Sequence, residues 1–167
     1  LKNMKIKSVI LLFALALSLS AFAGGKYAGV PKKYHALLDR AMVTAGGNAK
    51  ELKKALKEVP ASEREGMAFL ISYMPERDAK TLTADFLKEH VQYAYKARNE
   101  FPWAKAVPND IFLNDVVAYV NLNEERESWR KDFYERFKKY VAQCKTMREA
   151  IDSVNKNIRD EVQVDYN

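Results

Sequence analysis

The chain has 167 residues, of which 48% are hydrophobic and 30% are charged, and its formal net charge is +6. This length suits one compact domain with its own apolar core and argues against several domains. The single cysteine, Cys144, excludes an internal disulfide, so the fold must depend on that core.

The first 23 residues have the layout of a secretory signal peptide. Three lysines precede the apolar run Val9–Leu19, and small residues follow it at Ala21 and Ala23. The run is shorter than the ~20 residues that a membrane-spanning helix needs. We therefore expect cleavage after Ala23 and a soluble periplasmic or secreted protein, with a retained anchor as the alternative. The sequence has no cysteine near this cut site, so a lipid anchor is not expected.

Removal of this segment also lowers the net charge. Without its three lysines, 25 of the 28 Lys and Arg remain against 22 Asp and Glu, which gives +3. A charge this small, spread over faces that mix Lys with Glu, is ordinary for solubility. We therefore expect no nucleic-acid partner.

Helical periodicity predicts two short helices after the signal segment. The first spans residues 31–45, with Pro31 in its first turn, and Gly46-Gly47 ends it. The second begins near Ala49 and ends at Pro60.

A third helix is predicted from Ser62 to Met74. Ser62 and Glu65 form a capping-box pattern, in which each side chain bonds a backbone N–H of the first turn, and Pro75 ends the helix. A longer helix is then predicted from about Thr81 to Arg98. Its expected inner residues are Leu82, Phe86, Val91, Tyr93, Ala94 and Ala97.

The run that follows Pro108 is apolar and rich in β-branched residues, so helix and strand are hard to separate there. We predict a helix for residues 109–118. Asn123 is the expected N-cap of a long amphipathic helix with an aromatic stripe, which we interpret as core rather than as a ligand site. The stripe consists of Trp129, Phe133, Phe137, Tyr140 and Val141.

Thr146 and Glu149 repeat the capping-box pattern at the start of the last predicted helix. After it, Val162, Val164 and Tyr166 alternate with polar residues in the manner of a half-buried strand. The expected fold is thus mainly α, a helical array of about six to seven helices after a signal peptide, with a possible short terminal strand. The expected domain bounds are 1–23, 24–160 and 161–167.

The sequence offers no recognisable catalytic set. A nucleophilic Cys144 would need a base, and the only histidines are His35 and His90. Cys144 lies in the tail of an amphipathic helix, whereas a helix N-terminus is the position that activates a thiol, so we interpret it as structural. The spacing of these three residues gives no metal site, and the glycines form no phosphate-binding loop. No cofactor, metal or catalytic residue is expected.

Residues 107–130 mix apolar residues with many Asn and Asp. Turn formation and helix capping by Asn and Asp is the simpler interpretation. The alternative is that Trp129 and Arg130, together with the Asn-Glu turn before them, form a docking surface for another domain.

Four short segments, in their order and spacing, resemble a helical N-terminal region found in Bacteroidetes transglutaminase-like proteins. They are Phe69–Pro75 (FLISYMP), Pro108–Leu113 (PNDIFL), Asn123-Glu124 and Trp129-Arg130. The resemblance extends over roughly residues 48–167. In that family the helical region precedes a papain-like transglutaminase core.

The resemblance implies a secreted protein whose catalytic Cys, His and Asp lie in the following domain. Such a core, where it retains its triad, acts on amide bonds by acyl transfer or by hydrolysis through a thioester. None of those motifs occurs in this chain, and Cys144 does not stand in the family's nucleophile context. Residues 161–167 are then the expected lead-in to a downstream core that this chain lacks.

The first function hypothesis is therefore a non-catalytic helical module that packs against, positions or shields that core. Its only expected partner is the core of the same protein, with no stable membrane anchor after signal cleavage. The candidate interface residues are Phe112, Asn123, Trp129 and Arg130.

The second hypothesis is a self-sufficient periplasmic helical protein that binds or interacts on its own. Its expected surface is the aromatic-rich face around Tyr93, Tyr95, Phe101 and Trp103. This protein would need no downstream sequence for a cooperative fold.

Overall fold

The computed structural model describes residues 25–120 and 124–162. The chain divides into two compact units, residues 1–30 and 31–167. In the first, the described residues form a turn in which the Val30 N–H donates to the Tyr27 carbonyl at 3.1 Å. The predicted signal peptide and its cut site lie outside the described residues.

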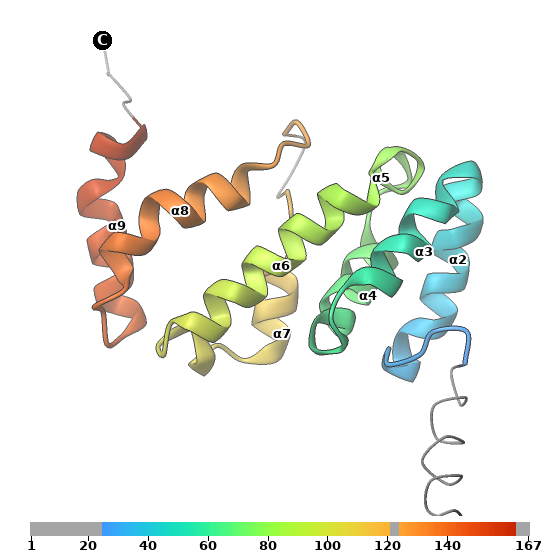
Figure 1. The fold of residues 1–167 in the computed structure, drawn as a ribbon, viewed down its shortest axis with the longest axis horizontal. Coiled ribbons are helices and arrows are strands. Elements are labelled where there is room, and N and C mark those ends of the chain that lie inside the picture. Colours follow the sequence, from blue (N-terminus) through green and yellow to red (C-terminus); the bar gives the residue numbers. More distant parts are fainter. Residues whose placement is uncertain (1–24, 121–123, 163–167) are drawn as a thin grey trace, which may run out of the picture. The chain divides into compact units, whose positions relative to one another are not determined.

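The second unit is mainly helical, which confirms the predicted fold class. No strand occurs in the part of it that the structure describes. Its α-helices, shown in Figure 1, are α2 (His35–Ala45), α3 (Ala49–Glu58), α4 (Arg64–Tyr73), α5 (Glu76–Thr81), α6 (Ala84–Glu100), α7 (Asn109–Ile111), α8 (Trp129–Val141) and α9 (Met147–Val162). Short 3-10 turns lie at Lys32–Tyr34, Gly46–Asn48, Ala61–Glu63 and Ala104–Ala106.

Helix α6 occupies the middle of this unit (Figure 1). It packs against α3 and α4 on one side and against α8 on the other, and α8 in turn packs against α9. Leu87, Val91 and Ala94 of α6 are buried almost completely. A second apolar cluster, formed by Phe101, Tyr134 and smaller residues, fills the space between α6, α8 and α9.

Side chains from the start of α3 hold the corner between α5 and α6. The Asn48 amide donates to the carbonyls of Ala79 and Leu82, each at 2.9 Å. The Glu51 carboxylate accepts the Ala84 N–H at 3.0 Å, which gives the first turn of α6 a partner from another helix. These bonds connect residues more than 30 positions apart.

The capping box predicted at Ser62 and Glu65 does not form. Helix α4 begins at Arg64, after a 3-10 turn, and its N-cap makes no side-chain bond. Glu65 instead forms an ion pair with Lys33 at 2.9 Å. The pattern failed because the chain reaches α4 through the 3-10 turn, which starts the helix one residue later than a box at Ser62 requires.

The second predicted box forms in part at the start of α9. The Glu149 N–H donates to the Thr146 hydroxyl at 3.2 Å, as a capping box requires. The Glu149 carboxylate accepts the Lys145 N–H at 2.7 Å, one residue before Thr146, rather than the Thr146 N–H.

The helix predicted from about Thr81 begins later, at Ala84, with Thr83 as its N-cap. A separate short helix, α5, precedes it and was not expected. The backbone is extended at Leu82 and Thr83, which ends α5, and the Thr83 side chain then caps α6 by accepting the Phe86 N–H.

Residues 109–118 are helical at their start, as predicted. Helix α7 continues into a π turn, Phe112–Val116, which the Val117 N–H closes by donating to the Phe112 carbonyl at 2.9 Å.

Two expectations for the residues after this turn need correction. Helix α8 begins at Trp129, so Asn123, outside the described residues, is not its N-cap. Val162 ends α9 rather than beginning a strand, and 163–167 lie outside the described residues.

Gly66 lies inside α4 where the ring of Tyr95 passes against its backbone. The Gly66 N–H donates to the Tyr95 hydroxyl at 3.2 Å. A Cβ atom at Gly66 would lie 2.6 Å from Cε2 of Tyr95, which is too close for any real contact. The absence of a side chain at this position therefore allows α4 and α6 to approach.

The substitution Gly66→Ala should lower the free energy of unfolding by about 1–3 kcal/mol, because overpacking outweighs the gain of ~1 kcal/mol in helix propensity. Chemical denaturation measures the change. Gly47→Ala is the matched control, since a Cβ there meets open space. In a Tyr95→Ala background Gly66→Ala should no longer destabilise; an equal loss there would contradict the proposed clash.

Candidate functional site

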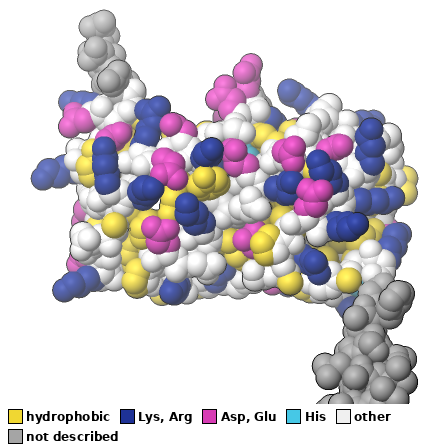
Figure 2. Space-filling model, viewed as in Figure 1, with side chains coloured by type: hydrophobic (Ala, Val, Ile, Leu, Met, Phe, Trp, Pro, Cys, Tyr) yellow, Lys and Arg dark blue, Asp and Glu magenta, His cyan; other side chains and the backbone are white. Residues whose placement is uncertain are grey.

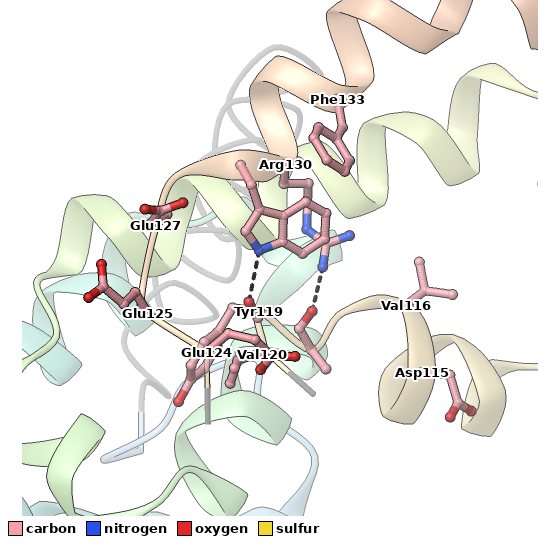
Figure 3. A pocket seen from close by; sticks show the side chains of 11 residues that line it. Asp115, Val116, Tyr119, Val120, Glu124, Glu125, Glu127, Arg130 and Phe133 are labelled. Carbon is pink, nitrogen blue, oxygen red and sulfur yellow. Dashed lines mark hydrogen bonds between the residues drawn. The ribbon is translucent and has the colours of Figure 1, made fainter. Parts of the chain in front are cut away.

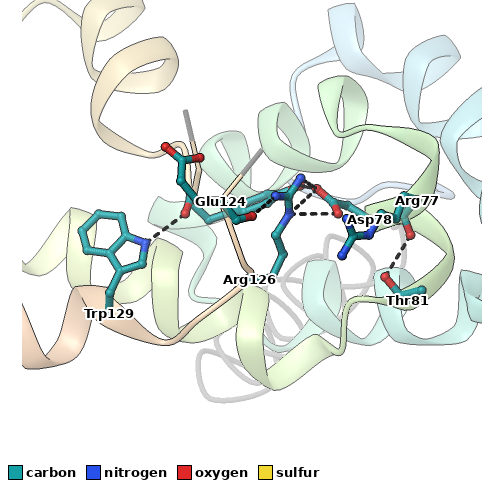
Figure 4. Close-up of polar contacts among 7 residues, drawn as sticks. Arg77, Asp78, Thr81, Glu124, Arg126 and Trp129 are labelled. Atoms are coloured by element: carbon teal, nitrogen blue, oxygen red, sulfur yellow. Dashed lines mark hydrogen bonds and ion pairs between the residues drawn. The ribbon is translucent and has the colours of Figure 1, made fainter. Parts of the chain in front are cut away.

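One buried carboxylate fixes the non-helical segment that leads into α8. Asp78 of α5 is 0% exposed, and Figure 4 shows the Arg126 side chain directed at it. Arg126 donates from Nε to Oδ1 at 3.0 Å and from Nη2 to Oδ2 at 2.9 Å. The Tyr119 hydroxyl donates to Oδ2 at 2.8 Å. Asp78 therefore holds Tyr119 and Arg126, which are seven positions apart in the chain, against α5.

The charges of this cluster stabilise one another. Burial, followed by the Asp78 carboxylate, raises the pKa of Tyr119 far above its usual value, so its hydroxyl remains a donor. The hydrogen bond to Asp78 raises the pKa of Arg126. The ion pair is shielded from solvent, with Arg126 only 12% exposed in its side chain.

His90 of α6 holds the same segment from a second side. Its side chain is fully buried, and Nε2 lies 3.0 Å from the Glu127 carbonyl oxygen. Because a carbonyl only accepts, Nε2 carries the proton of the neutral ring and Nδ1 carries none. Nδ1 is buried without a partner. The rings around the imidazole are those of Phe86, Tyr119 and Trp129.

Burial and, to a smaller extent, the nearby charge of Arg130 lower the pKa of His90 to about 4, although the bond to the Glu127 carbonyl acts in the opposite direction. The imidazole is therefore neutral at physiological pH. A second proton would have to enter at Nδ1, where no acceptor receives it.

The first turn of α8 bonds back to the segment that precedes it. The Trp129 indole N–H donates to the Tyr119 carbonyl at 3.0 Å, and Arg130 Nη2 donates to the Ala118 carbonyl at 2.5 Å (Figure 3). The Arg130 guanidinium also lies over the Trp129 ring, 4.6 Å from its centroid. Burial lowers the pKa of Arg130 to about 10. Both side chains are thereby fixed in one orientation.

These bonds define the walls of a groove with a volume of about 620 Å³. Apolar and acidic side chains share its lining, and Phe133 stands at one side of the view in Figure 3. Phe133 is 44% exposed, and its ring centroid lies 5.6 Å from that of Trp129. The lining residues are Asp115, Val116, Ala118, Tyr119, Val120, Glu124, Glu125, Glu127, Trp129, Arg130 and Phe133.

The four predicted interface residues have different positions. Trp129 and Arg130 lie side by side in the groove. Phe112 does not lie on the surface: it is 1% exposed, because the π turn directs its ring into the core against Tyr95. Asn123 lies outside the described residues.

Sequence reasoning did not single out Phe133 as exposed. The stripe was interpreted as core, yet in α8 the buried residues are Tyr134 and Val141. Adjacent positions of a helix differ by about 100° in direction, so burial of Tyr134 turns Phe133 outward. An aromatic stripe alone does not reveal which flank the neighbouring helices cover.

The aromatic face of the second hypothesis is not one surface. Tyr95 packs on Gly66 and Phe112. Phe101 stacks on Trp103, with 5.5 Å between the ring centroids, and both belong to the apolar cluster against α8 and α9. Phe101 is only 5% exposed.

Cys144 and His90 belong to different clusters. Cys144 packs against the cluster of Phe101 and Tyr134, and its thiol donates to the Tyr140 carbonyl at 3.5 Å. Within residues 25–120 and 124–162, no three His, Cys, Asp or Glu side chains are grouped to hold a metal ion. None of the helices in those ranges has the length and apolar character to cross a membrane.

No protein-family model, curated protein or solved structure matches this chain. We therefore argue function from the geometry of the groove.

The substitution Asp78→Asn should destabilise the fold by about 3 kcal/mol, because it leaves Arg126 without its buried counter-ion. Thermal or chemical unfolding measures this loss. Asp85→Asn is the matched control: Asp85 pairs with Lys88 at the surface, and its loss should have a much smaller effect on stability. Equal effects of the two substitutions would show that Asp78 does not anchor the segment.

Protonation of His90 should destabilise the fold, because it places a charge on a buried ring close to Arg130. The folded pKa, about 4, lies below the unfolded value of 6.5, so the unfolded chain gains a proton first as the pH falls. Stability from His90 is therefore complete above pH 6.5 and is lost down to pH 4. Between pH 7.5 and 4.5 the loss should be about 2 to 3 kcal/mol.

The variant His90→Gln keeps an amide donor for the Glu127 carbonyl but cannot titrate. The difference in unfolding free energy between wild type and this variant should change by about 2 to 3 kcal/mol between pH 7.5 and 4.5. His35→Gln serves as the control for removal of a histidine elsewhere. A difference that does not vary with pH would refute the assignment of a neutral, buried His90.

Proposed function

We propose that this chain is a non-catalytic helical module that docks another protein domain in the groove beside α8. The observation that carries the proposal is the pair Trp129 and Phe133. Both rings line an open groove, and Phe133 is 44% exposed. Apolar rings that remain exposed in a groove with polar sides are typical of interaction sites.

The groove is also preorganised. Trp129 and Arg130 are each bonded to backbone carbonyls of the opposite wall, so docking would cost little of their side-chain entropy. Trp and Arg are the residue types that dominate binding energy at protein interfaces. Asp78 and His90 fix the walls from behind.

The resemblance to Bacteroidetes transglutaminase-like proteins supports one identity for the docked domain. It would be the papain-like core of the same exported protein, which the module would position or shield. Trp129 and Arg130 belong to the segments that carry this resemblance and also line the groove. In this proposal all catalytic groups lie in the core and Cys144 has a structural role.

A self-sufficient periplasmic binding protein is the second candidate. The observation that favours it is the groove volume of about 620 Å³, which falls within the range of small-molecule sites. In that case the same rings would contact a small ligand rather than a domain.

The exposed rings should bind a dye that fluoresces on apolar surface. Phe133→Ser should reduce dye fluorescence by roughly half without lowering the unfolding midpoint, because the side chain is exposed and contributes little to the core. Ile158→Ser is the matched control, since Ile158 is 41% exposed on α9 outside the groove. Dye binding that Phe133→Ser leaves unchanged would contradict the proposed surface.

The domain partner can be tested from the gene. The reading frame beyond the codon for Asn167 should encode a domain with Cys, His and Asp, and that domain, expressed separately, should bind this chain but not its Phe133→Ser variant. An immediate natural stop codon would exclude an intramolecular core and favour the second candidate.

A further inference from the structure

Carboxylates dominate the exposed charge of the groove. Asp115, Glu124, Glu125 and Glu127 line it, and Figure 2 shows acidic side chains projecting at the loop before α8. Asp115, Glu125 and Glu127 are exposed, and no Lys or Arg among the described residues lies within ion-pair distance of them. Their charges therefore face whatever occupies the groove.

The one cation of the lining does not offset these charges. Arg130 donates to the Ala118 carbonyl and lies over the Trp129 ring, and its Nε is buried without a partner. No carboxylate of the described residues forms an ion pair with it. The guanidinium is thus bonded to the wall of the groove and forms no ion pair with the exposed carboxylates of the described residues.

The apolar lining and the charge together restrict the occupant. Trp129, Phe133 and Val120 offer apolar contact, so the occupant needs apolar side chains. A nucleic acid or an anionic membrane surface would be repelled by the carboxylates. An acidic segment would meet the same repulsion.

We infer that the groove receives a basic protein segment, in which apolar side chains contact Trp129 and Phe133 while flanking Lys or Arg side chains face Glu125, Glu127 and Asp115. This inference rests on the proposed docking function and specifies the chemistry of the partner. Charge complementarity of this kind speeds association and excludes wrong partners more than it adds affinity.

The test uses the full chain and three fluorescein-labelled nonapeptides that share the same Leu and Phe residues. Their flanking residues are Lys in the first, Gln in the second and Glu in the third. Fluorescence anisotropy should show that the Lys peptide binds about tenfold more tightly than the Gln peptide and that the Glu peptide binds most weakly. High salt should reduce the advantage of the Lys peptide.

Two sets of variants assign the effect to the groove. The double variant Glu125→Gln, Glu127→Gln should reduce the preference for Lys over Gln flanks, since it removes two of the groove's carboxylates. The matched double variant Asp152→Asn, Asp160→Asn removes two exposed carboxylates of α9 and should preserve it. Phe133→Ser should weaken binding of the Lys and Gln peptides alike.

The outcomes separate this inference from the proposed function. If the Gln and Glu peptides bind as tightly as the Lys peptide and still depend on Phe133, the groove docks segments but the charge inference is wrong. If none of the peptides binds, both the inference and groove docking are overturned. A Lys preference that Glu125→Gln, Glu127→Gln leaves undiminished would also overturn the inference, because these two carboxylates would then not contact the flanking residues.

Discussion

The interaction on which the candidate site depends is the ion pair of Asp78 with Arg126. A carboxylate that is 0% exposed is costly to bury unless its oxygens are fully bonded, and here Arg126 and Tyr119 supply those bonds. The bonds that offset the cost of burying Asp78 also fix the positions of its two partners. Tyr119 and Arg126 lie outside the helices, and these bonds hold them against α5, where Tyr119 forms part of the groove wall.

The helices determine where this anchor can act. Helix α6 packs against α3 and α4 and also against α8, so His90 on α6 lies behind the wall that Asp78 holds from α5. The groove is therefore held by long-range contacts from Asp78 and His90 and by shorter-range bonds from Trp129 and Arg130. Helix α8 contributes its exposed ring, Phe133, because Tyr134 faces the cluster with Phe101.

Local chemistry determined what the sequence could predict. The stops at Gly46 and Pro60 and the cap at Thr146 act within a few residues, so their patterns located helix ends. The capping box at Ser62 failed, and Phe112 proved to be core, because packing between distant segments decides both. Asp78 carries no local signal, since its partners lie more than 40 positions away. Trp129 and Arg130 were singled out by residue type and context, whereas the outward direction of Phe133 depends on the burial of its neighbour.

The electrostatic arrangement follows from the same packing. Two of the cations near the groove are used internally: Arg126 by Asp78, and Arg130 by the Ala118 carbonyl and the Trp129 ring. His90 stays neutral because its ring is buried. The carboxylates of Glu125 and Glu127 have no such internal role and remain exposed. The groove is therefore apolar inside and negatively charged at its edge. A partner with both basic and apolar side chains matches this surface better than a partner with only basic or only apolar side chains.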